Sequence, residues 1–470
     1  MIYDFLIAGA GVIGSMIARE LSRYQVSICM LEKENDVACG ATKANSGIVH
    51  GGYDPEPGTL KAKLNTQGVE LLFEAARQLH VPCIRNGSLV CAFCAEDDQS
   101  IQKLYDRGQI NQIPGLEILT GEQARALEPQ LSPAVTSALH VTNAGIICPY
   151  ELTIAAAGNA MDNGAQLLRQ FQIIKIEKRN DLFVVTAADG RQVLGKTLIN
   201  CAGTGSDQIA RLAGDDCFTI IPRAGEYMLL DKTEGSRVKH TIFQVPTREG
   251  KGILVSPTVD GNLLVGPTAG VCQSTDTTPE GLQTVGKLSA KSVPTVNFRS
   301  VITSFAGIRS SEKDGDFIIR YSEKIKNLLH VAAIDSPGLT CCVSIARYVV
   351  ELIGQLPVNP EFNGTRPDPH RFRHMSDEEK NRAIVNDPAY GKIVCRCETV
   401  SEGEIRDAIL RNPPALDVDG VKRRTRSGMG RCQGGFCGPY VMELLAKLNN
   451  IPKEQITKNG GDSYMLTGKL

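Results

Sequence analysis

Long hydrophobic runs are missing from this sequence. No stretch of about 18 or more uncharged apolar residues occurs, so no transmembrane helix is predicted. The apolar start, residues 1–18, lacks the basic segment of a secretory signal peptide and runs directly into a glycine motif. We therefore expect no direct membrane insertion, and any association with a membrane would need a partner. Tryptophan is also absent, which excludes nothing.

An excess of charge of one sign is missing as well. The chain has 51 Lys and Arg against 52 Asp and Glu, a net charge of −1. This balance gives no reason to expect a nucleic-acid partner or an anionic membrane surface. The 15 cysteines are odd in number and scattered along a long chain, unlike the dense cysteines of small secreted domains. A reducing, cytoplasmic location is therefore expected.

The N-terminal residues follow the pattern of a β-α-β unit. Residues 3–8 form a short apolar run typical of a buried parallel strand, and residues 12–23 suit a helix. A second apolar run covers residues 26–31. Strands are predicted again within residues 220–266 and a helix at residues 344–356. With 470 residues, the chain is long enough for about three domains.

Gly9, Gly11 and Gly14 form a G-x-G-x-x-G motif between the first strand and the helix. The first glycine permits a sharp turn, the second lets backbone approach a pyrophosphate, and the third lets helix and strand pack closely. The helix N-terminus offers unpaired N–H groups to the phosphates. Glu32 ends the second strand, where it can accept hydrogen bonds from ribose hydroxyls. A dinucleotide site is predicted; a glycine-rich turn without a ligand is the alternative.

Two further features favour FAD over NAD. Residues 200–205, Asn-Cys-Ala-Gly-Thr-Gly, resemble the second glycine motif of two-domain flavoproteins, in which Ala202 and Gly203 would lie close to the cofactor. Four cysteines near the C-terminus are suited to an iron–sulfur cluster. Nicotinamide transfers hydride and a cluster transfers single electrons, whereas flavin does both and can couple the two.

Residues 40–52 contain Gly-Ala-Thr and Asn-Ser-Gly-Ile-Val-His-Gly-Gly, which resembles the flavin-facing segment of the D-amino-acid-oxidase-like superfamily. That superfamily includes glycerol-3-phosphate dehydrogenases and L-2-hydroxyglutarate dehydrogenases. Residues 394–398 and 423–434 are similar to the C-terminal part of the large, A-type flavin subunit of bacterial anaerobic glycerol-3-phosphate dehydrogenase. Because both ends match, the resemblance covers nearly the whole chain.

The resemblance implies further contacts with FAD. Thr42, Ser46 and Gly47 belong to the flavin-facing segment. The turn before the helix at residues 344–356 would present a helix N-terminus to the flavin pyrimidine, where reduced flavin is negatively charged; a plain strand–helix turn is the alternative. The residues of this turn are Gly338, Leu339 and Thr340.

The residues expected near the substrate partly favour a different substrate. Glycerol-3-phosphate dehydrogenases often carry an arginine just after the His-x-Gly segment, placed to meet the substrate phosphate. Here Gly52 is followed by Tyr53 and Asp54, which is closer to the L-2-hydroxyglutarate enzymes, as is the sequence Gly-Glu-Tyr at residues 225–227. The substrate is therefore open between glycerol 3-phosphate and a 2-hydroxy or 2-amino acid.

Cys395, Cys397, Cys432 and Cys437 are arranged as C-x-C and C-x4-C, separated by 34 residues. Four thiolates suit a 2Fe-2S cluster or zinc. C-x-C is too short for the usual zinc knuckle, which favours the cluster, and empty structural thiols are a third alternative. The module resembles the helical bacterioferritin-associated ferredoxin domain. The basic residues of 422–431 would stabilise a reduced cluster, or form a solvated basic face.

Oxidation of a secondary alcohol needs a hydride acceptor, a base, and cations for the anionic end of the substrate. His50 is the candidate base because imidazole titrates near neutral pH; packing on or hydrogen-bonding to the flavin is the alternative. Arg309, in a G-I-R context, matches the superfamily's active-site arginine and could clamp a carboxylate or phosphate, with a structural ion pair as the alternative. Lys61 and Lys63 are second-choice anion contacts. Being two apart on a helix, they face different ways.

The predicted fold class is α/β: a doubly wound, Rossmann-like FAD-binding domain with an inserted mixed-sheet substrate domain and a small helical C-terminal iron–sulfur domain. The boundaries are 1–80, 142–218 and 300–356 for the FAD-binding domain, 81–141 and 219–299 for the substrate-binding domain, 357–387 for a linker, 388–450 for the 2Fe-2S-binding domain and 451–470 for a tail.

The predicted function is FAD-dependent oxidation of glycerol 3-phosphate to dihydroxyacetone phosphate. Electrons would pass through the 2Fe-2S cluster to a second protein subunit or a quinone-linked acceptor. L-2-hydroxyglutarate, or another 2-hydroxy or 2-amino acid, is the alternative substrate. An electron-transfer subunit without its own substrate is the alternative of a different class.

Overall fold

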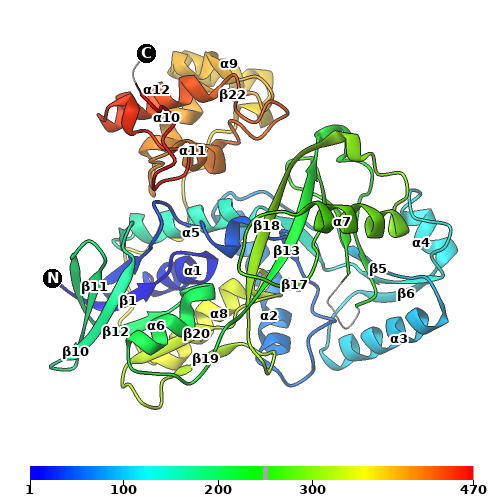
Figure 1. Ribbon diagram of the computed structural model, residues 1–470, viewed down its shortest axis with the longest axis horizontal. Helices are drawn as coiled ribbons and strands as arrows, with labels where there is room; N and C mark the ends of the chain where they lie inside the picture. The colour runs from blue at the N-terminus through cyan, green and yellow to red at the C-terminus, as the bar shows by residue number, and fades with distance from the viewer. Residues whose placement is uncertain (247–251, 469–470) are drawn as a thin grey trace.

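The computed structural model describes residues 1–246 and 252–468. Residues 247–251, inside the predicted substrate domain, and the last two residues of the predicted tail lie outside this description. Figure 1 shows three lobes: the N-terminal sheet with its helices, a second sheet beside it, and a small helical lobe formed by the C-terminal part of the chain.

The first sheet has a parallel centre built around β1 (Ile2–Ala8). On one side of β1 lie β2 (Ile28–Leu31) and β9 (Gln166–Leu168), and on the other lie β12 (Gln192–Asn200) and β20 (Leu328–Ala332). Antiparallel strands extend it: β10 (Ile173–Arg179) and β11 (Leu182–Ala187) beside β12, and β19 (Ile318–Tyr321) beside β20. This is the arrangement expected of a dinucleotide-binding domain.

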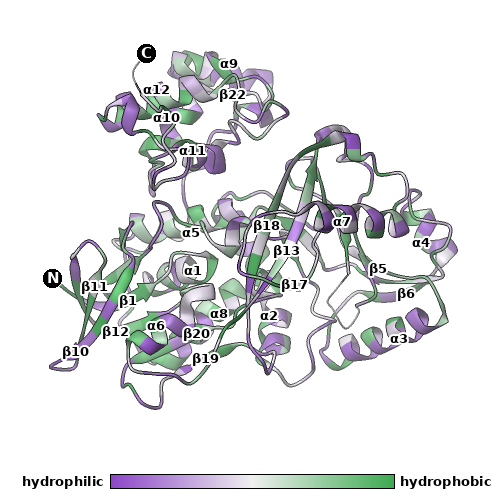
Figure 2. Cartoon of the chain, viewed as in Figure 1, coloured by the Kyte–Doolittle hydropathy of each residue, from purple (hydrophilic) through white to green (hydrophobic). Residues whose placement is uncertain are grey.

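Alternate residues of β1 enter two different hydrophobic clusters, as a strand covered on both faces requires. Phe5 and Ile7 belong to the core shared with the helices. Leu6 and Ala8 pack on the other face, against residues of β10, β11 and the loop before them. The hydropathy colouring in Figure 2 shows the resulting apolar strand. The helices are α1 (Val12–Leu21), α2 (Leu60–Gln78), α5 (Pro149–Asp162) and α8 (Gly338–Ile353); α6 (Ser206–Leu212) packs next to β10, β12 and β20.

The second sheet has the order β17-β13-β16-β15-β14-β5-β7-β6, with β18 beside β13. It is mixed, because β14 runs parallel to β5 while the other pairs are antiparallel. β18 (Val301–Ser311) falls in the range 300–356 that the sequence assigned to the FAD-binding domain, yet it pairs with β13 (Ile221–Leu230) over nearly its whole length.

The other elements of this lobe follow from the same chain segments. The strands are β5 (Ser88–Ala92), β6 (Leu116–Thr120), β7 (Ser137–Val141), β14 (Thr241–Gln244), β15 (Leu254–Pro257), β16 (Leu263–Gly266) and β17 (Gly270–Val271), and the helices are α3 (Ala95–Ile110), α4 (Gly121–Leu127) and α7 (Pro279–Ser292). A separate small sheet has the strand order β3-β8-β4, with β3 (Ile48–Val49), β8 (Gly145–Ile147) and β4 (Cys83–Ile84).

The helical lobe has its own core. Ile405 of α10 (Glu402–Leu410), Val421 of α11 (Val418–Thr425) and Leu445 of α12 (Gly438–Asn449) are fully buried together. Ile456, in the segment expected to be a tail, is also fully buried in this core. A short hairpin of β21 (Ile393–Cys395) and β22 (Val400–Ser401) completes the lobe. In the following text this lobe is called the cluster domain.

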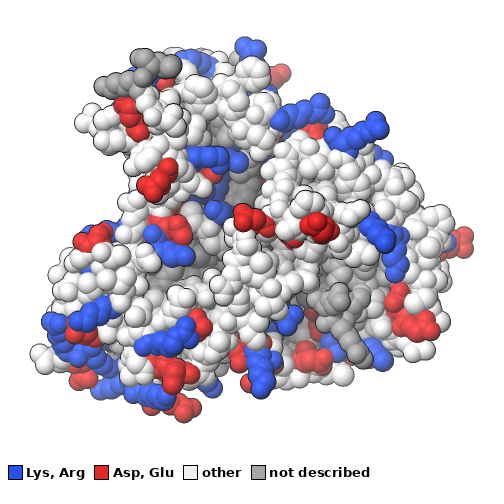
Figure 3. Space-filling model, in the orientation of Figure 1, with Lys and Arg blue, Asp and Glu red and all other residues white. Residues whose placement is uncertain are grey.

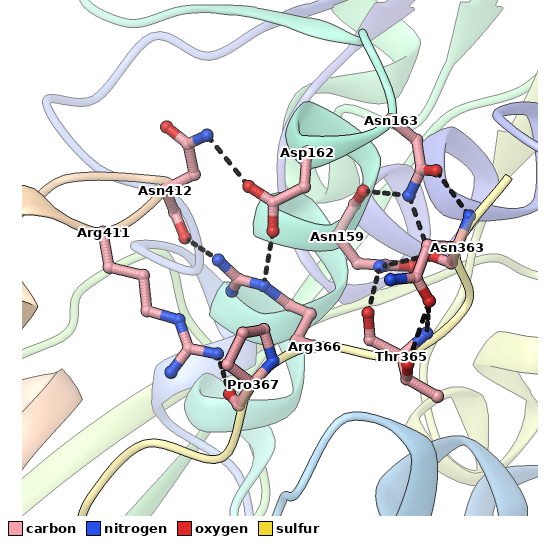
Figure 4. A pocket seen from close by; sticks show the side chains of 9 residues that line it. All are labelled: Asn159, Asp162, Asn163, Asn363, Thr365, Arg366, Pro367, Arg411 and Asn412. Atoms are coloured by element: carbon pink, nitrogen blue, oxygen red, sulfur yellow. Dashed lines mark hydrogen bonds and ion pairs between the residues drawn. The ribbon is translucent and has the colours of Figure 1, made fainter. Parts of the chain in front are cut away.

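The segment expected to be a linker, residues 357–387, is tied down along α5. Arg366 donates from Nε to the Asp162 carboxylate at 2.8 Å and from Nη2 to the Asn412 carbonyl at 2.7 Å. Asn159 and Asn163 both donate to the Asn363 carbonyl at 2.9 Å. Figure 4 shows these side chains meeting where α5, the segment and the cluster domain come together. A helix, α9 (Asp377–Asn386), forms within the same segment.

Buried ion pairs fix the cluster domain on the first lobe. Asp36, in the loop after β2, accepts hydrogen bonds from Arg423 and Arg424 of α11 at 2.7 to 2.8 Å. All three side chains are at most 7% exposed. Burial alone would raise the pKa of Asp36, but the two guanidiniums more than offset this and hold its pKa well below the usual range.

A second buried network fixes the cluster domain on the second sheet. Arg426, just after α11, pairs with Asp260 of the β15–β16 turn at 2.7 Å and with Glu398 of the cluster domain at 2.8 Å. Arg373 bridges the same two carboxylates, and Lys232 reaches Glu398 at 2.9 Å. The cluster domain is therefore clamped between both sheets.

No helix in the described ranges is long and apolar enough to cross a membrane. On the face drawn in Figure 3, basic and acidic side chains are interspersed, as the near-zero net charge predicts.

Replacing Asp36 by Asn should loosen the cluster domain, because two buried guanidiniums would lose their only shared carboxylate. Removing one partner of a buried pair costs about 3–5 kcal/mol. We expect hydrogen exchange of the α11 amides to accelerate accordingly. Because the Asp36 pKa is depressed when folded, this stabilisation is present at neutral pH and is lost as pH falls below about 3.9. Asp216→Asn, which removes the exposed partner of Lys324, should leave α11 exchange unchanged; an equal effect of both variants would contradict the clamp.

Candidate active site

The glycine turn after β1 has no room for side chains. Gly9 has φ +99°, and a Cβ there would lie 2.6 Å from the Cys201 carbonyl oxygen. A Cβ on Gly14 would lie 2.0 Å from the Gly9 carbonyl oxygen, so helix α1 packs directly on the turn. Gly11 is the N-cap of α1, and a Cβ there would be 3.3 Å from Thr42 Oγ1. The cradle has the shape that a bound pyrophosphate needs.

Glu32 and Thr42 hold this cradle. The buried Glu32 carboxylate accepts the Ala10 N–H at 2.8 Å and the Glu34 N–H at 3.0 Å. Burial raises the pKa of Glu32, partly offset by these hydrogen bonds. Thr42 Oγ1 accepts the Val12 N–H at 3.1 Å, which links the flavin-facing segment to the first turn of α1.

The second glycine motif lies directly beside the first. β1 and β12 are parallel with Ala8 opposite Asn200, so both strands end at the same edge of the sheet. Cys201 N–H donates to the Ala8 carbonyl at 2.9 Å. Ala202 and Gly203 follow, and Gly203 has φ +58°. The two turns predicted to border one cofactor are thus adjacent.

The segment with Ser46 and Gly47 contacts both the second sheet and the small β3-β8-β4 sheet. Ser46 Oγ lies 3.1 Å from the Tyr227 hydroxyl of β13. The Gly47 carbonyl accepts the Ile147 N–H at 2.8 Å, and a Cβ on Gly47 would lie 2.6 Å from the Ile147 carbonyl oxygen. This segment therefore lies between the glycine cradle and the β13–β18 ribbon.

His50 and the turn before α8 meet at the end of this segment. His50 Nε2 is 3.3 Å from Ser336 Oγ, and the His50 N–H donates to Thr340 Oγ1 at 2.9 Å. The His50 ring is also 5.9 Å from the Phe243 ring. Helix α8 begins at Gly338, earlier than the sequence pattern indicated, so Gly338, Leu339 and Thr340 form its first turn. His50 is thereby held against a helix N-terminus.

The two lysines of α2 diverge, as their spacing predicted. Lys61 Nζ forms an ion pair with Asp335 at 2.5 Å, next to Ser336 and the His50 ring. Lys63 is exposed and lies over the Tyr348 ring, 5.0 Å from its centroid. Of the two, only Lys61 is close to His50, and its charge is already matched by a carboxylate.

Arg309 lies near the end of β18, next to Ser310, whose hydroxyl donates to the Ile334 carbonyl at 3.2 Å. Its strand end is thus joined to the same turn that holds His50. Within residues 1–246 and 252–468, Arg309 has no ion pair with a carboxylate. Its guanidinium lies over Gly225 of β13: a Cβ there would be 2.8 Å from Arg309 Nη2.

The four predicted metal ligands gather in the cluster domain as two pairs. Cys397 Sγ and Cys432 Sγ are 3.7 Å apart, and a hydrogen bond from Cys437 holds the pKa of Cys395 below its usual range. Two thiolates on one tetrahedral metal ion, at about 2.3 Å, are roughly 3.8 Å apart. Among the residues with described positions, no three of these sulfurs lie within 4.8 Å of one another. The donors therefore fit two metal ions, two thiolates on each, rather than one zinc.

Most of the basic residues beside Cys432 are used in ion pairs with other parts of the chain. Arg423, Arg424 and Arg426 are buried in the ion pairs that clamp the cluster domain, and Arg431 pairs with Asp231 of the second lobe at 3.0 Å. Arg423, Arg424 and Arg426 each meet a carboxylate of another lobe, whereas the Arg431 side chain stays 67% exposed at the surface of the cluster domain. The loop they precede still reaches the first lobe, because Tyr150 of α5 donates to Met429 Sδ at 3.5 Å.

A family profile described as "FAD dependent oxidoreductase" matches residues 4–352. The chain belongs to this family. A second profile, "BFD-like 2Fe-2S binding domain", matches residues 393–447. Together they confirm the predicted fold class, the FAD and the 2Fe-2S cluster, and the protein is an FAD-dependent oxidoreductase.

Individual relatives narrow the comparison. A glycerol 3-phosphate dehydrogenase of Caloramator mitchellensis is 44% identical over 474 residues, covering 99% of this chain and 98% of the relative. The structure of dithionite-reduced L-alpha-glycerophosphate oxidase from Mycoplasma pneumoniae with FAD bound superposes with a TM-score of 0.75 at 32% identity, covering 78% of this chain and 98% of that one. Mitochondrial L-2-hydroxyglutarate dehydrogenase of Homo sapiens is 30% identical over 285 residues, 57% of this chain and 61% of the relative.

Several residues that shape the site gave no local signal in the sequence. Residues 334–340 were expected to form a turn that faces the flavin, but nothing singled out Asp335 or Ser336 within it, and Gly225 is one glycine among 46. Their roles depend on contacts with β18 and α2, far away in the chain. The Gly-Glu-Tyr sequence at residues 225–227 was noticed, but only as a family likeness.

Gly11→Val should greatly reduce FAD content, because a branched side chain at the N-cap of α1 would enter the cradle and press on Thr42. The measurement is the ratio of flavin to protein absorbance after reconstitution with FAD. Gly286→Ala is the matched control: it lies in α7 of the second lobe, where a Cβ has no neighbour closer than 4.0 Å. Normal flavin content in the Gly11 variant would contradict the assignment of the cradle.

Proposed function

We propose that this enzyme oxidises glycerol 3-phosphate to dihydroxyacetone phosphate. The observation that carries the proposal is Arg309, a guanidinium with no ion pair to a carboxylate in the described ranges, joined through one turn to His50. The 44% sequence identity to a glycerol 3-phosphate dehydrogenase over nearly the whole chain supports this choice of substrate.

Each residue of the site has a role in this proposal. Bound FAD supplies the two-electron acceptor. Arg309 binds the anionic end of the substrate, since its planar fork can donate two parallel hydrogen bonds to phosphate oxygens. His50 takes the hydroxyl proton at Nε2, the atom that faces Ser336. Lys61, paired with Asp335, is the second-choice anion contact beside His50, and the exposed position of Lys63 makes it the weaker candidate.

The cofactor contacts are part of the same proposal. Gly9, Gly11, Gly14 and Glu32 would hold the pyrophosphate and ribose, and Thr42, Ser46, Gly47, Ala202 and Gly203 would line the cofactor. The first turn of α8, Gly338, Leu339 and Thr340, would place its N–H groups and partial positive charge at the pyrimidine end of the flavin.

L-2-hydroxyglutarate is the second candidate substrate. Tyr53 stands where glycerol-3-phosphate dehydrogenases often have an arginine, and it is buried in a hydrophobic cluster with residues of the second sheet. An anion with a carboxylate in place of phosphate would still be bound by Arg309. A substrate-free electron-transfer subunit is the alternative of another class.

We further propose that electrons leave through the cluster domain to a second protein subunit or a quinone-linked acceptor, which could also bring the enzyme to a membrane. Cys397 is exposed and Cys432 partly so, whereas Cys395 and Cys437 are buried. Phe436, between two of the ligands, is 90% exposed. An exposed aromatic side chain beside exposed ligands is what contact with an acceptor protein requires.

Anaerobic addition of glycerol 3-phosphate should bleach the flavin absorbance, and L-2-hydroxyglutarate should not. Arg309→Lys should keep FAD but lower kcat/KM by roughly 10- to 100-fold, because lysine keeps the charge and loses the bidentate fork. If only L-2-hydroxyglutarate bleaches the flavin, it is the substrate in place of glycerol 3-phosphate. If neither compound does, the result favours an electron-transfer subunit without its own substrate. Normal turnover by the Arg309→Lys variant would mean that Arg309 has only a structural role.

Protein prepared anaerobically should contain iron and inorganic sulfide in equal amounts and give a paramagnetic resonance signal with dithionite. Cys432→Ser should leave flavin bleaching by substrate intact and slow electron delivery to an artificial one-electron acceptor, because it alters one of the exposed ligands. The Cys94→Ser variant, at the exposed N-cap of α3 in the second lobe, controls for loss of a thiol. Zinc in place of iron, or unchanged electron delivery, would refute this route.

A further inference from the structure

Arg223 of β13 lies directly opposite Arg309 of β18 in their antiparallel pairing. Residues directly opposite each other point to the same face of the sheet, with Cβ atoms about 4.5–5.5 Å apart. Arg223 is exposed, and Arg309 is half-buried. Two arginines thus stand side by side at the end of the ribbon.

This face of the ribbon is turned toward the flavin-facing segment. Tyr227, four residues from Arg223 and therefore on its face, contacts Ser46 at 3.1 Å. Gly307, two residues from Arg309 and therefore on the same face, lies so close to the Ala44 carbonyl that a Cβ would be 1.8 Å from its oxygen. The row of side chains leads from the segment that borders FAD outward to the arginine pair.

Neither arginine of the pair forms an ion pair with any carboxylate in the described part of the chain. Other arginines of this protein behave differently: Arg366, Arg371 and Arg426 each meet a carboxylate at 2.8 Å or less. Like charges directly opposite on neighbouring strands are destabilising. Such a pair is tolerated where an anion lies between the two charges and accepts hydrogen bonds from both.

A glycine next to the pair gives the Arg309 guanidinium the space it occupies. Position 225, diagonal to Arg309 on the same face, is a glycine whose Cβ would lie 2.8 Å from Arg309 Nη2 and 2.7 Å from Pro267. The guanidinium of Arg309 is therefore displaced toward the flavin-facing segment. Arg223 keeps the outer position, where the charged end of a substrate would enter.

We propose that Arg223 is a second phosphate contact, which together with Arg309 makes the site specific for a phosphate dianion over a carboxylate. The inference rests on the proposed function and deepens it. It also supplies the cation that is missing after the His-x-Gly segment, where Tyr53 is buried. A dianion gains from two guanidiniums, whereas Arg309 alone can satisfy a carboxylate in bidentate fashion.

The test uses the oxidised holoenzyme and inorganic phosphate, followed by the shift of the flavin absorbance and by equilibrium dialysis. Arg223→Gln should weaken phosphate binding about 10-fold or more, the effect of losing a hydrogen bond to a charged group. Arg223→Lys should recover part of the loss because the charge returns. Arg299→Gln, an exposed arginine just before the other end of β18, removes the same net charge and should bind phosphate normally.

Turnover separates this inference from the proposed function. With glycerol 3-phosphate, Arg223→Gln should raise KM about 10-fold and leave the limiting rate of flavin reduction unchanged, since His50 and Arg309 are retained. If the wild-type flavin is not reduced by glycerol 3-phosphate, the proposed function fails while phosphate binding still tests the arginine pair. Equal phosphate binding by wild type and Arg223→Gln, or no phosphate binding by the wild type, would overturn the inference.

Discussion

The arrangement of the three lobes depends on carboxylates buried against arginines at their junctions. Asp36 of the first lobe and Asp260 of the second are each almost fully buried and each meet two guanidiniums from the C-terminal part of the chain. Such pairs are expensive to bury and gain little over apolar contacts, but a charge left alone there is far worse. These ion pairs therefore determine where the cluster domain packs, because its arginines are paired only when both carboxylates face them. The hydrogen bonds along α5 then fix the intervening segment.

Local patterns were sufficient for the first lobe, because its signals are short-range. A strand, a glycine turn, a helix and an acid at the end of the next strand all lie within residues 3–32, and the structure has them as β1, α1 and β2. The cysteine spacing was equally local. The sequence pattern predicts that this helix begins at residue 344, whereas α8 begins at Gly338. Its first turn contains a glycine and a threonine, which have low helix propensity, and tertiary contacts such as that of Thr340 with His50 stabilise it.

What could not be read from the sequence depends on pairing between distant segments. The arginine-rich run at residues 422–431 looked like a neighbour of the cluster or a solvated surface, and only the positions of Asp36 and Asp260 reveal its structural use. Similarly, Arg309 could be singled out by its motif, but Arg223 could not, since its significance arises from the register of β13 on β18. The ion pair of Lys61 with Asp335 likewise joins segments that lie far apart in the sequence. The role of a charged side chain can therefore be assigned only once the group that it contacts in the folded protein is known.

The attachment of the cluster domain also has a kinetic meaning. Some redox proteins carry a mobile domain that swings between donor and acceptor, so that their rate depends on diffusion and on solvent viscosity. Here Arg424, Arg426 and Arg366 hold the domain from three sides, and the Tyr150–Met429 contact joins its loop to α5. Any electron exchange between the two cofactors then takes place at one constant separation. The rate of that exchange should therefore not depend on the viscosity of the medium, for example on added sucrose. In this respect the cluster domain is a fixed part of the enzyme and not a mobile domain.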